Sequence, residues 1–274
     1  MSSSIRMPAV SGYFYPSTAA VLQQEIQRYT ESVEKIKNIP LGAVLPHAGY
    51  AYSGHTTGAF FGSVNTVYDV IVIMGPNHTG YGHALSLDAN DGWKTPLGVV
   101  DVDTVFRSML LKHLGSLGKV ESQAHSLEHS IEVQLPFIQT FFPKASIVPV
   151  CIGLDSFDLS HALGEALYSA AKESGKRILV IASSDMTHFK EDDEARRLDN
   201  LAIERMLRVD PRGLYNLVKE KGISMCGYMP ACALLEYAQR KTTSETVLLD
   251  YSTSADSSGD KSSVVGYASI ALYK

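Results

Sequence analysis

Four short apolar runs constrain the fold of this chain more than any other feature. They cover residues 41–45, 70–74, 146–152 and 178–182, and none of them alternates with polar residues. Such runs predict strands that are buried on both faces, which is typical of a parallel sheet covered by helices. Stretches with apolar residues at helical spacing separate the runs. The expected fold is therefore α/β, with a largely parallel or mixed central sheet flanked by helices.

Histidines follow three of these four runs. His47 and His78 come after the first two runs, each through a turn that contains proline, and His188 comes after the fourth. In open α/β sheets, ligands bind just outside the carboxyl ends of the strands. We therefore expect the three imidazoles to meet at one edge of the sheet.

Length and charge exclude several classes of protein. The 274 residues contain no repeat and no linker-like segment, which predicts one domain over residues 1–274. The net charge of -5 argues against nucleic acid or an anionic membrane surface as a partner. No apolar stretch approaches the ~20 residues that cross a bilayer. The first residues lack the apolar segment of a signal peptide, so we expect a cytoplasmic location with free thiols.

Two histidines and one cysteine are candidate metal ligands. Neutral imidazole, as in His47 and His78, commonly binds zinc, copper or ferrous iron. Cys226 precedes a predicted helix, whose dipole is expected to lower the thiol pKa and favour the thiolate. The alternative is that the histidines only form surface hydrogen bonds and that the cysteine is a small buried residue. We apply that alternative to Cys151 and Cys232.

Asp185 and His188 are spaced for proton transfer. The carboxylate would orient the imidazole, and His188 would then donate or accept protons. An equally physical alternative is that residues 183–185 form the N-cap of a helix.

A polar stripe runs along a helix predicted over residues 127–141. Its members are His125, Glu128, His129 and Glu132, opposite an apolar face. A stripe of imidazoles and carboxylates is either a metal site or a solvated face. We favour a third role, in which these side chains support metal ligands from outside.

Five motifs in order resemble one known family. They are Leu45-Pro46-His47-Ala48-Gly49-Tyr50, Gly75-Pro76-Asn77-His78, Glu128-His129-Ser130-Ile131-Glu132, Ser183-Ser184-Asp185 and Met225-Cys226-Gly227. Together they resemble the Memo family (mediator of ErbB-driven cell motility), and the resemblance extends from residue 11 to residue 267. That family is similar in fold to the class III extradiol dioxygenases, the LigB-like enzymes that open catechol rings with ferrous iron.

The resemblance implies a role for several residues. His47 and His78 match the two histidine ligands of the dioxygenases, and Cys226 takes the position of the third ligand. His188 matches the acid/base histidine. Phe14 stands beside the pocket, where some members carry tryptophan.

Three functions remain open at this point. The first is metal-dependent redox chemistry on a small aromatic molecule or a peptide-borne aromatic group, with iron or copper as cofactor and zinc less favoured. The second is a non-catalytic module that uses the same pocket to bind a peptide or protein. The third is a metal-free thiol enzyme, with Cys226 activated by His188 or His47. Prokaryotic members also suggest a radical-SAM protein as partner, and residues 252–263 form either a lid or a surface loop.

Overall fold

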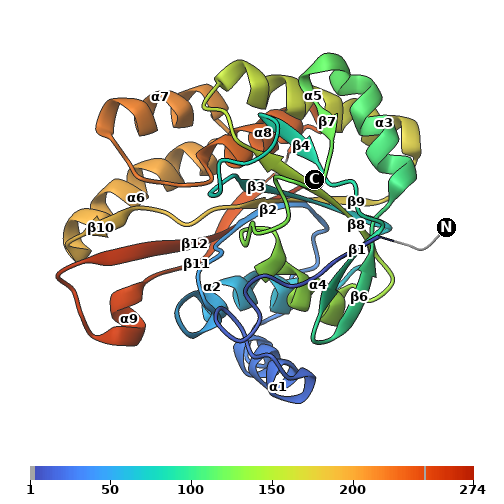
Figure 1. Ribbon diagram of the computed structural model, residues 1–274. Coiled ribbons are helices and arrows are strands. Elements are labelled where there is room, and N and C mark those ends of the chain that lie inside the picture. Colours follow the sequence, from blue (N-terminus) through green and yellow to red (C-terminus); the bar gives the residue numbers. More distant parts are fainter. Residues whose placement is uncertain (1–3, 244) are drawn as a thin grey trace.

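The computed structural model describes residues 4–243 and 245–274, and a mixed nine-stranded sheet lies at its centre (Figure 1). The strand order is β10-β12-β2-β9-β3-β8-β4-β7, and β11 pairs with β12. The bounds are β2 Pro40–Leu45, β3 Val70–Pro76, β4 Leu85–Leu87, β7 Lys119–Val120, β8 Ser146–Ile152, β9 Ile178–Ser183, β10 His188–Lys190, β11 Glu245–Thr253 and β12 Val264–Tyr273.

The four apolar runs form the parallel centre of this sheet. They become β2, β9, β3 and β8, which pair in parallel in that order. On either side, β12 pairs antiparallel with β2, and β4 pairs antiparallel with β8. The predicted α/β fold with a mixed, helix-flanked sheet is therefore confirmed. The extent of the single domain stays a prediction.

Helices cover both faces of the sheet (Figure 1). One layer contains α3 Thr104–Leu114, α5 Phe157–Ser174, α6 Asp192–Leu207, α7 Pro211–Lys221 and α8 Tyr228–Arg240. The other contains α1 Ala19–Thr30, α2 Tyr50–Ser63 and α4 Leu135–Phe141. In the described part of the chain, no helix is long and apolar enough to cross a membrane.

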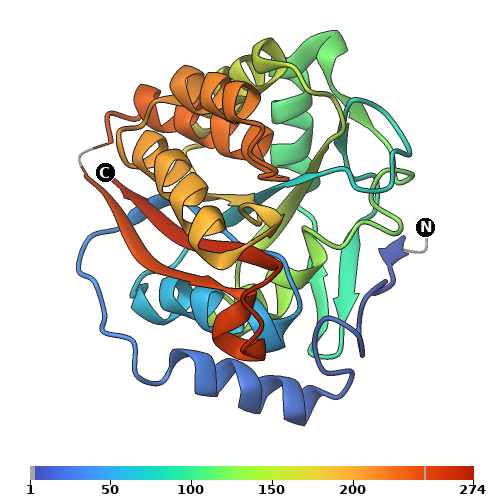
Figure 2. The ribbon, with the colours of Figure 1, turned by 90° about the vertical axis from the view of Figure 1, so that its left-hand side faces the viewer.

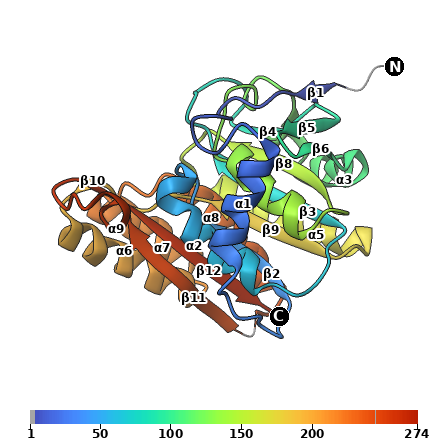
Figure 3. The ribbon, with the colours of Figure 1, turned by 90° about the horizontal axis from the view of Figure 1, so that it is seen from below.

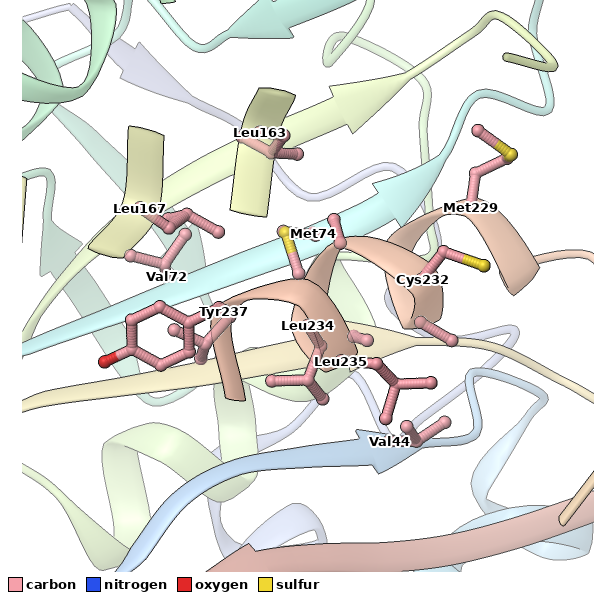
Figure 4. Packing of buried hydrophobic residues seen from close by; sticks show 14 of the residues in the cluster. Val44, Val72, Met74, Leu163, Leu167, Met229, Cys232, Leu234, Leu235 and Tyr237 are labelled. Carbon is pink, nitrogen blue, oxygen red and sulfur yellow. The ribbon is translucent and has the colours of Figure 1, made fainter. Parts of the chain in front are cut away.

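Alternate residues of the central strands face two separate cores. In β3, Val72 and Met74 pack under α5 and α8, whereas Ile71 and Ile73 pack under the opposite layer. Figure 4 shows the first core, with Leu234 of α8 lying over the sheet. Burying one such aliphatic side chain contributes roughly 1.5–3 kcal/mol, which explains why all six or seven positions of these strands are apolar or small.

Smaller elements complete the fold. β1 Ile5–Arg6, β5 Gly92–Thr95 and β6 Gly98–Asp101 form a second sheet, in which β5 and β6 pair as an antiparallel hairpin. Short 3-10 helices cover Gly115–Leu117 and Glu132–Gln134. β11 and β12 form a long hairpin that carries the short helix α9 Ser254–Ser258 (Figure 2). Within residues 252–263, the first two residues end β11 and Ser254–Ser258 form α9, while the choice between a lid and a surface loop stays a prediction.

Three glycines let α1 and α2 lie close together. Gly54, Gly58 and Gly62 lie on the face of α2 that meets the end of α1 and the segment after it, and a Cβ atom on Gly58 would overlap the carbonyl oxygen of Tyr29. Figure 3 shows the two helices side by side on one face of the sheet. The pair covers β2, from whose end the site is built.

Two local predictions are wrong. Residues 127–131 do not form the first part of a helix, since a 3-10 turn begins only at Glu132 and leads into α4 at Leu135. The reason is local: the Glu128 carboxylate accepts a hydrogen bond from the amide of Ser130 at 2.8 Å, which competes with helical backbone bonding. The N-cap interpretation of residues 183–185 also fails, because the short strand β10 follows them rather than a helix.

Candidate metal centre

Three histidines gather at the carboxyl edge of the sheet. His47 follows β2 and His78 follows β3, so both leave the same edge. One ring nitrogen from each of His47, His78 and His129 lies within 4.8 Å of the others. The His78 and His129 rings stack with centroids 4.6 Å apart, and the His47 ring meets the His78 ring edge-on at 5.2 Å. This spacing is close enough for one metal ion to bind all three after small side-chain movements.

Ser183 fixes the tautomer of His47. The serine hydroxyl donates to the carbonyl of Ser130 at 2.6 Å, so its oxygen is left to accept hydrogen bonds. It accepts one from Gln134 Nε2 at 3.1 Å, and His47 Nδ1 lies 3.0 Å away. Nδ1 must therefore carry the proton, which leaves the lone pair of Nε2 free to bind a metal. Burial, together with two neighbouring histidines, holds the pKa of His47 well below its usual value, so the ring is neutral.

Glu128 fixes His78 in the same way. Its Oε1 lies 2.9 Å from His78 Nδ1, and its Oε2 accepts from the backbone amide of His78 at 2.6 Å. Burial favours the neutral carboxyl, but hydrogen bonds from His78 and Ser130 outweigh it and lower the pKa of Glu128 to about 2. An ionised carboxylate only accepts, so Nδ1 of His78 carries a proton and Nε2 remains available. Burial opposes protonation of His78 too, yet Glu128 raises its pKa.

Cys226 adds a sulfur beside the cluster. Its Sγ lies 3.2 Å from His47 Nε2 and accepts from the amide of Asp185 at 3.3 Å. Burial raises the pKa of the thiol well above its usual value, which is opposite to the predicted lowering. The thiol lies two residues before the start of α8 at Tyr228, and it is buried beside the carboxylate of Asp185. Burial and this negative charge both oppose ionisation of the thiol. A bound metal would reverse this, because coordination deprotonates a thiol.

Asp185 supports His47 rather than His188. Its Oδ1 accepts from the backbone amide of His47 at 2.7 Å, and burial raises its pKa. His188 Nδ1 instead lies 2.9 Å from the carbonyl of Ser224, whose hydroxyl also accepts from the His188 amide at 2.7 Å. The predicted orientation of His188 by Asp185 is therefore wrong in its hydrogen bonding. His188 is half-buried and is not one of the three histidines whose ring nitrogens gather, so the expected meeting of His47, His78 and His188 holds only for the first two.

His129 is the residue that sequence reasoning gave too small a role. It was expected to support the ligands from outside, yet its ring belongs to the cluster itself. The helical pattern hid it, since residues 128–130 turn around the Glu128 carboxylate instead of continuing a helix. Phe14 lies against it as expected, with ring centroids 4.8 Å apart.

The other two members of the predicted stripe lie away from the cluster. His125 is buried beside Trp93, and its Nε2 lies 3.1 Å from the carbonyl of Ser86. Glu132 is also buried and pairs with Arg6. Neither contributes to the group of three imidazoles.

Glu132 instead holds the N-terminal segment in place. Its carboxylate accepts from the amides of Ala9 at 2.8 Å and Val10 at 3.1 Å, and from the hydroxyl of Tyr15 at 2.6 Å. Together with the Arg6 ion pair, these bonds anchor the segment that carries Phe14. The wall of the site therefore depends on a carboxylate that does not itself reach the cluster.

The other two cysteines are small buried residues, as predicted for them. Cys151 lies in β8 and Cys232 in α8, both fully buried, and burial raises the pKa of each thiol. The structure describes all three cysteines as free thiols.

Fold and site together define an α/β protein with a histidine cluster at the carboxyl edge of a mixed sheet. The model of the Memo family, described as "Memo-like protein", matches residues 6–271 of this chain. The chain belongs to this family.

Curated relatives of similar length support the assignment. The chain is 42% identical over 267 residues to a MEMO1 family protein of Methanosarcina acetivorans, covering 97% of this chain and 98% of the relative. It is 40% identical over 281 residues to one from Desulfurococcus amylolyticus, covering 98% and 99%. Among solved structures, the uncharacterized protein JW3007 from Escherichia coli K12 is similar in fold, with a TM-score of 0.55 and 12% identity over 84% of this chain and 98% of that one.

Proposed function

We propose that this chain binds a redox metal, iron or copper, through His47 and His78, and uses it to oxidise a small or peptide-borne aromatic group. The observation that carries the proposal is the convergence of three imidazole nitrogens within 4.8 Å of one another. The third ligand comes from His129 or from Cys226. The ring of His129 stacks on the ring of His78, and the Sγ of Cys226 contacts Nε2 of His47.

The donor set fits such a metal. Imidazole binds iron, copper and zinc, and the softer sulfur of Cys226 would shift the preference toward copper or zinc. The partners of His47 and His78 hold both rings in the tautomer that leaves Nε2 open, as outer partners do in metal sites. Because the His47 ring is neutral, no proton has to leave it before the metal binds.

The surrounding side chains support an aromatic substrate. When bound, the metal would supply electron transfer between an aromatic substrate and dioxygen. Phe14 offers an apolar wall next to His129, against which a second ring would stack. His188 is half-buried, and we propose it as the group that moves a proton to or from the substrate.

The first test is metal content after anaerobic purification. The triple variant H47A/H78A/C226A should lose the metal that the wild type retains. A matched control is H113A/H161A, which removes two histidines on the outer helices α3 and α5. Retention of metal by the triple variant would overturn the site. Binding of zinc alone, with no dioxygen consumption on a panel of catechols, would overturn the redox function.

The third ligand can be identified by cobalt substitution. If Cys226 binds the metal, the cobalt protein shows a sulfur-to-metal charge-transfer band that C226S lacks. If His129 binds it, that band is absent in the wild type and H129A weakens cobalt binding instead.

A second function is favoured by exposed aromatic side chains next to site residues. Tyr13 is 89% exposed beside Phe14, and Phe189 is 78% exposed beside His188 with a positive φ of 59°. Such strain in a bulky residue points to a functional constraint. A module that binds an aromatic peptide would retain affinity in the presence of a chelator and would consume no dioxygen. The third function, a metal-free thiol enzyme, would use the 3.2 Å contact of Cys226 Sγ with His47 Nε2, whereas burial raises the pKa of the thiol and works against it.

A further inference from the structure

A second cavity lies at the amino edge of the sheet, opposite the histidine cluster. Its volume is about 480 Å³, within the range of about 300–1,000 Å³ that is usual for small-molecule sites. Its walls come from the beginnings of β2 and β9, at Pro40 and Ile178, and from the end of α8, at Tyr237. In Figure 3 the C-terminal end of the chain lies beside the label of β2 at this edge. The cavity therefore shares no residue with the site described above.

The charged side chains that line the cavity are all cationic. Four cationic side chains line it and no acidic one does: Lys176, Arg177, Lys241 and Lys274. Lys176 pairs with Asp103 at 2.5 Å, but within the described residues no carboxylate lies within 4.0 Å of the other three side-chain cations. Two nearby carboxylates are occupied elsewhere: Asp69 accepts from the backbone amide of Arg177 at 2.8 Å, and Glu245 accepts a hydrogen bond from Asn38. An anion entering this cavity would therefore find cations that have no ion-pair partner in the described structure.

Lys241 is the cation best placed to meet a ligand. Its Nζ lies 5.7 Å from the ring centroids of both Tyr168 and Tyr237, so it is held among aromatic rings at the cavity wall. Burial and the nearby charge of Lys274 lower its pKa. A bound anion would relieve both effects, because it would replace lost solvation and offset the like charge.

Tyr237 adds an unused hydrogen-bond donor. The side chain is only 2% exposed, and its hydroxyl forms no hydrogen bond to any residue that the structure describes. Figure 4 shows the hydroxyl pointing away from the apolar core, toward the side where the central strands begin. The second tyrosine of the wall, Tyr68, uses its hydroxyl to donate to the carbonyl of Pro40 at 2.7 Å. Since no described residue pairs with it, the Tyr237 hydroxyl can donate to a ligand in the cavity.

We propose that this cavity binds a small aromatic acid. The carboxylate lies between Lys241 and Arg177, the ring packs against Leu41 and the tyrosine wall, and the Tyr237 hydroxyl donates to the ligand. The apolar wall explains why the ligand carries a ring, and the unpaired cations explain why it carries a negative charge. Binding here needs no metal and does not depend on the function proposed for the histidine cluster.

The test uses 2-naphthoate as the probe, measured by isothermal titration calorimetry on the full chain. Neutral 2-naphthamide supplies the same rings without the charge, and inorganic phosphate supplies charge without rings. We expect the wild type to bind 2-naphthoate about tenfold or more tightly than either, since a charge-assisted hydrogen bond and the ring contacts must act together.

Variants then locate the site. K241E should weaken 2-naphthoate binding about tenfold or more, and Y237F should weaken it several-fold, about the effect of one hydrogen bond. The matched control is K221E, which reverses an exposed lysine at the end of α7. H47A should leave the affinity unchanged, which separates this site from the histidine cluster. No binding to the wild type, equal binding of the amide, or equal loss in K241E and K221E would each overturn the proposal.

Discussion

The carboxylate of Glu128 holds His78 at two points, with Oε1 2.9 Å from the ring Nδ1 and Oε2 2.6 Å from the backbone amide. One buried side chain thus sets the position, the rotation and the tautomer of a candidate ligand. The two residues are 50 positions apart in the sequence. Their contact links the strand edge at β3 to the turn that also presents His129.

Replacing Glu128 by glutamine should weaken metal binding. The amide has only one acceptor oxygen, so its NH2 group would face a donor, either Nδ1–H or the backbone N–H of His78. Loss of such an outer partner typically costs about 10–100-fold in metal affinity. The measurement is competition against a chelator of known affinity, with E173Q, an exposed carboxylate on α5, as the control. Unchanged affinity in E128Q would show that His78 is not a ligand or needs no support.

Replacing Glu132 by glutamine should release the N-terminal segment. Arg6 would remain buried without its carboxylate, and breaking a buried ion pair in this way costs about 3–5 kcal/mol of unfolding free energy. Urea unfolding measures the loss, and faster amide exchange at Ala9 and Val10 would show where it acts. Y15F removes only one hydrogen bond to the same carboxylate, so about 1 kcal/mol is expected. Equal effects of the two variants would contradict the role assigned to Glu132.

The sheet could be predicted from sequence because burial on both faces leaves a signature in each strand. Residues 70–74 are apolar at every position, and β3 is buried at every position. The same logic placed His47 and His78 at one edge, which the structure confirms. Short strands such as β10 carry no such signature and were missed.

The role of His129 could not be predicted, because it depends on a local side-chain contact. The apolar spacing of residues 127–141 indicates a helix, but the contact of Glu128 with the Ser130 amide replaces the helical pattern at its start. The Glu128 carboxylate is held in place for that contact because it is also buried against His78. This burial comes from tertiary packing, which the local sequence does not show. The pKa of Cys226 was mispredicted for a related reason, since its burial depends on residues 184–185, far away in the sequence.

The ion pair of Asp103 and Lys176 should give a measurable pH dependence. Burial opposes ionisation of Asp103, but hydrogen bonds from Lys176 and the Phe106 amide outweigh it and lower its pKa. A carboxyl with a lowered folded pKa contributes stability above its unfolded pKa of about 3.9, and the contribution is lost as the pH falls through the folded value. D103N keeps the N-cap of α3 but loses the pair, so it should be less stable by about 0.2–1 kcal/mol at pH 7.

The difference between wild type and D103N should therefore shrink as the pH is lowered below about 4. Urea unfolding at several pH values measures it. D101N is the control, because Asp101 is an exposed carboxylate two positions earlier. A difference that is constant with pH would show that the pair contributes nothing and that only the cap matters.

Gly58→Ala should destabilise the protein, against the usual effect of this change in a helix. Alanine in an exposed helix interior normally stabilises by about 1 kcal/mol relative to glycine. At Gly58 the added methyl would overlap the backbone carbonyl of Tyr29, which cannot move aside as a flexible side chain can. Overpacking of this kind costs about 1–3 kcal/mol, so the thermal midpoint should fall. A rise in the midpoint would mean that α1 can shift away from α2, and the close packing of these helices would then not be needed to hold the loop that carries His47.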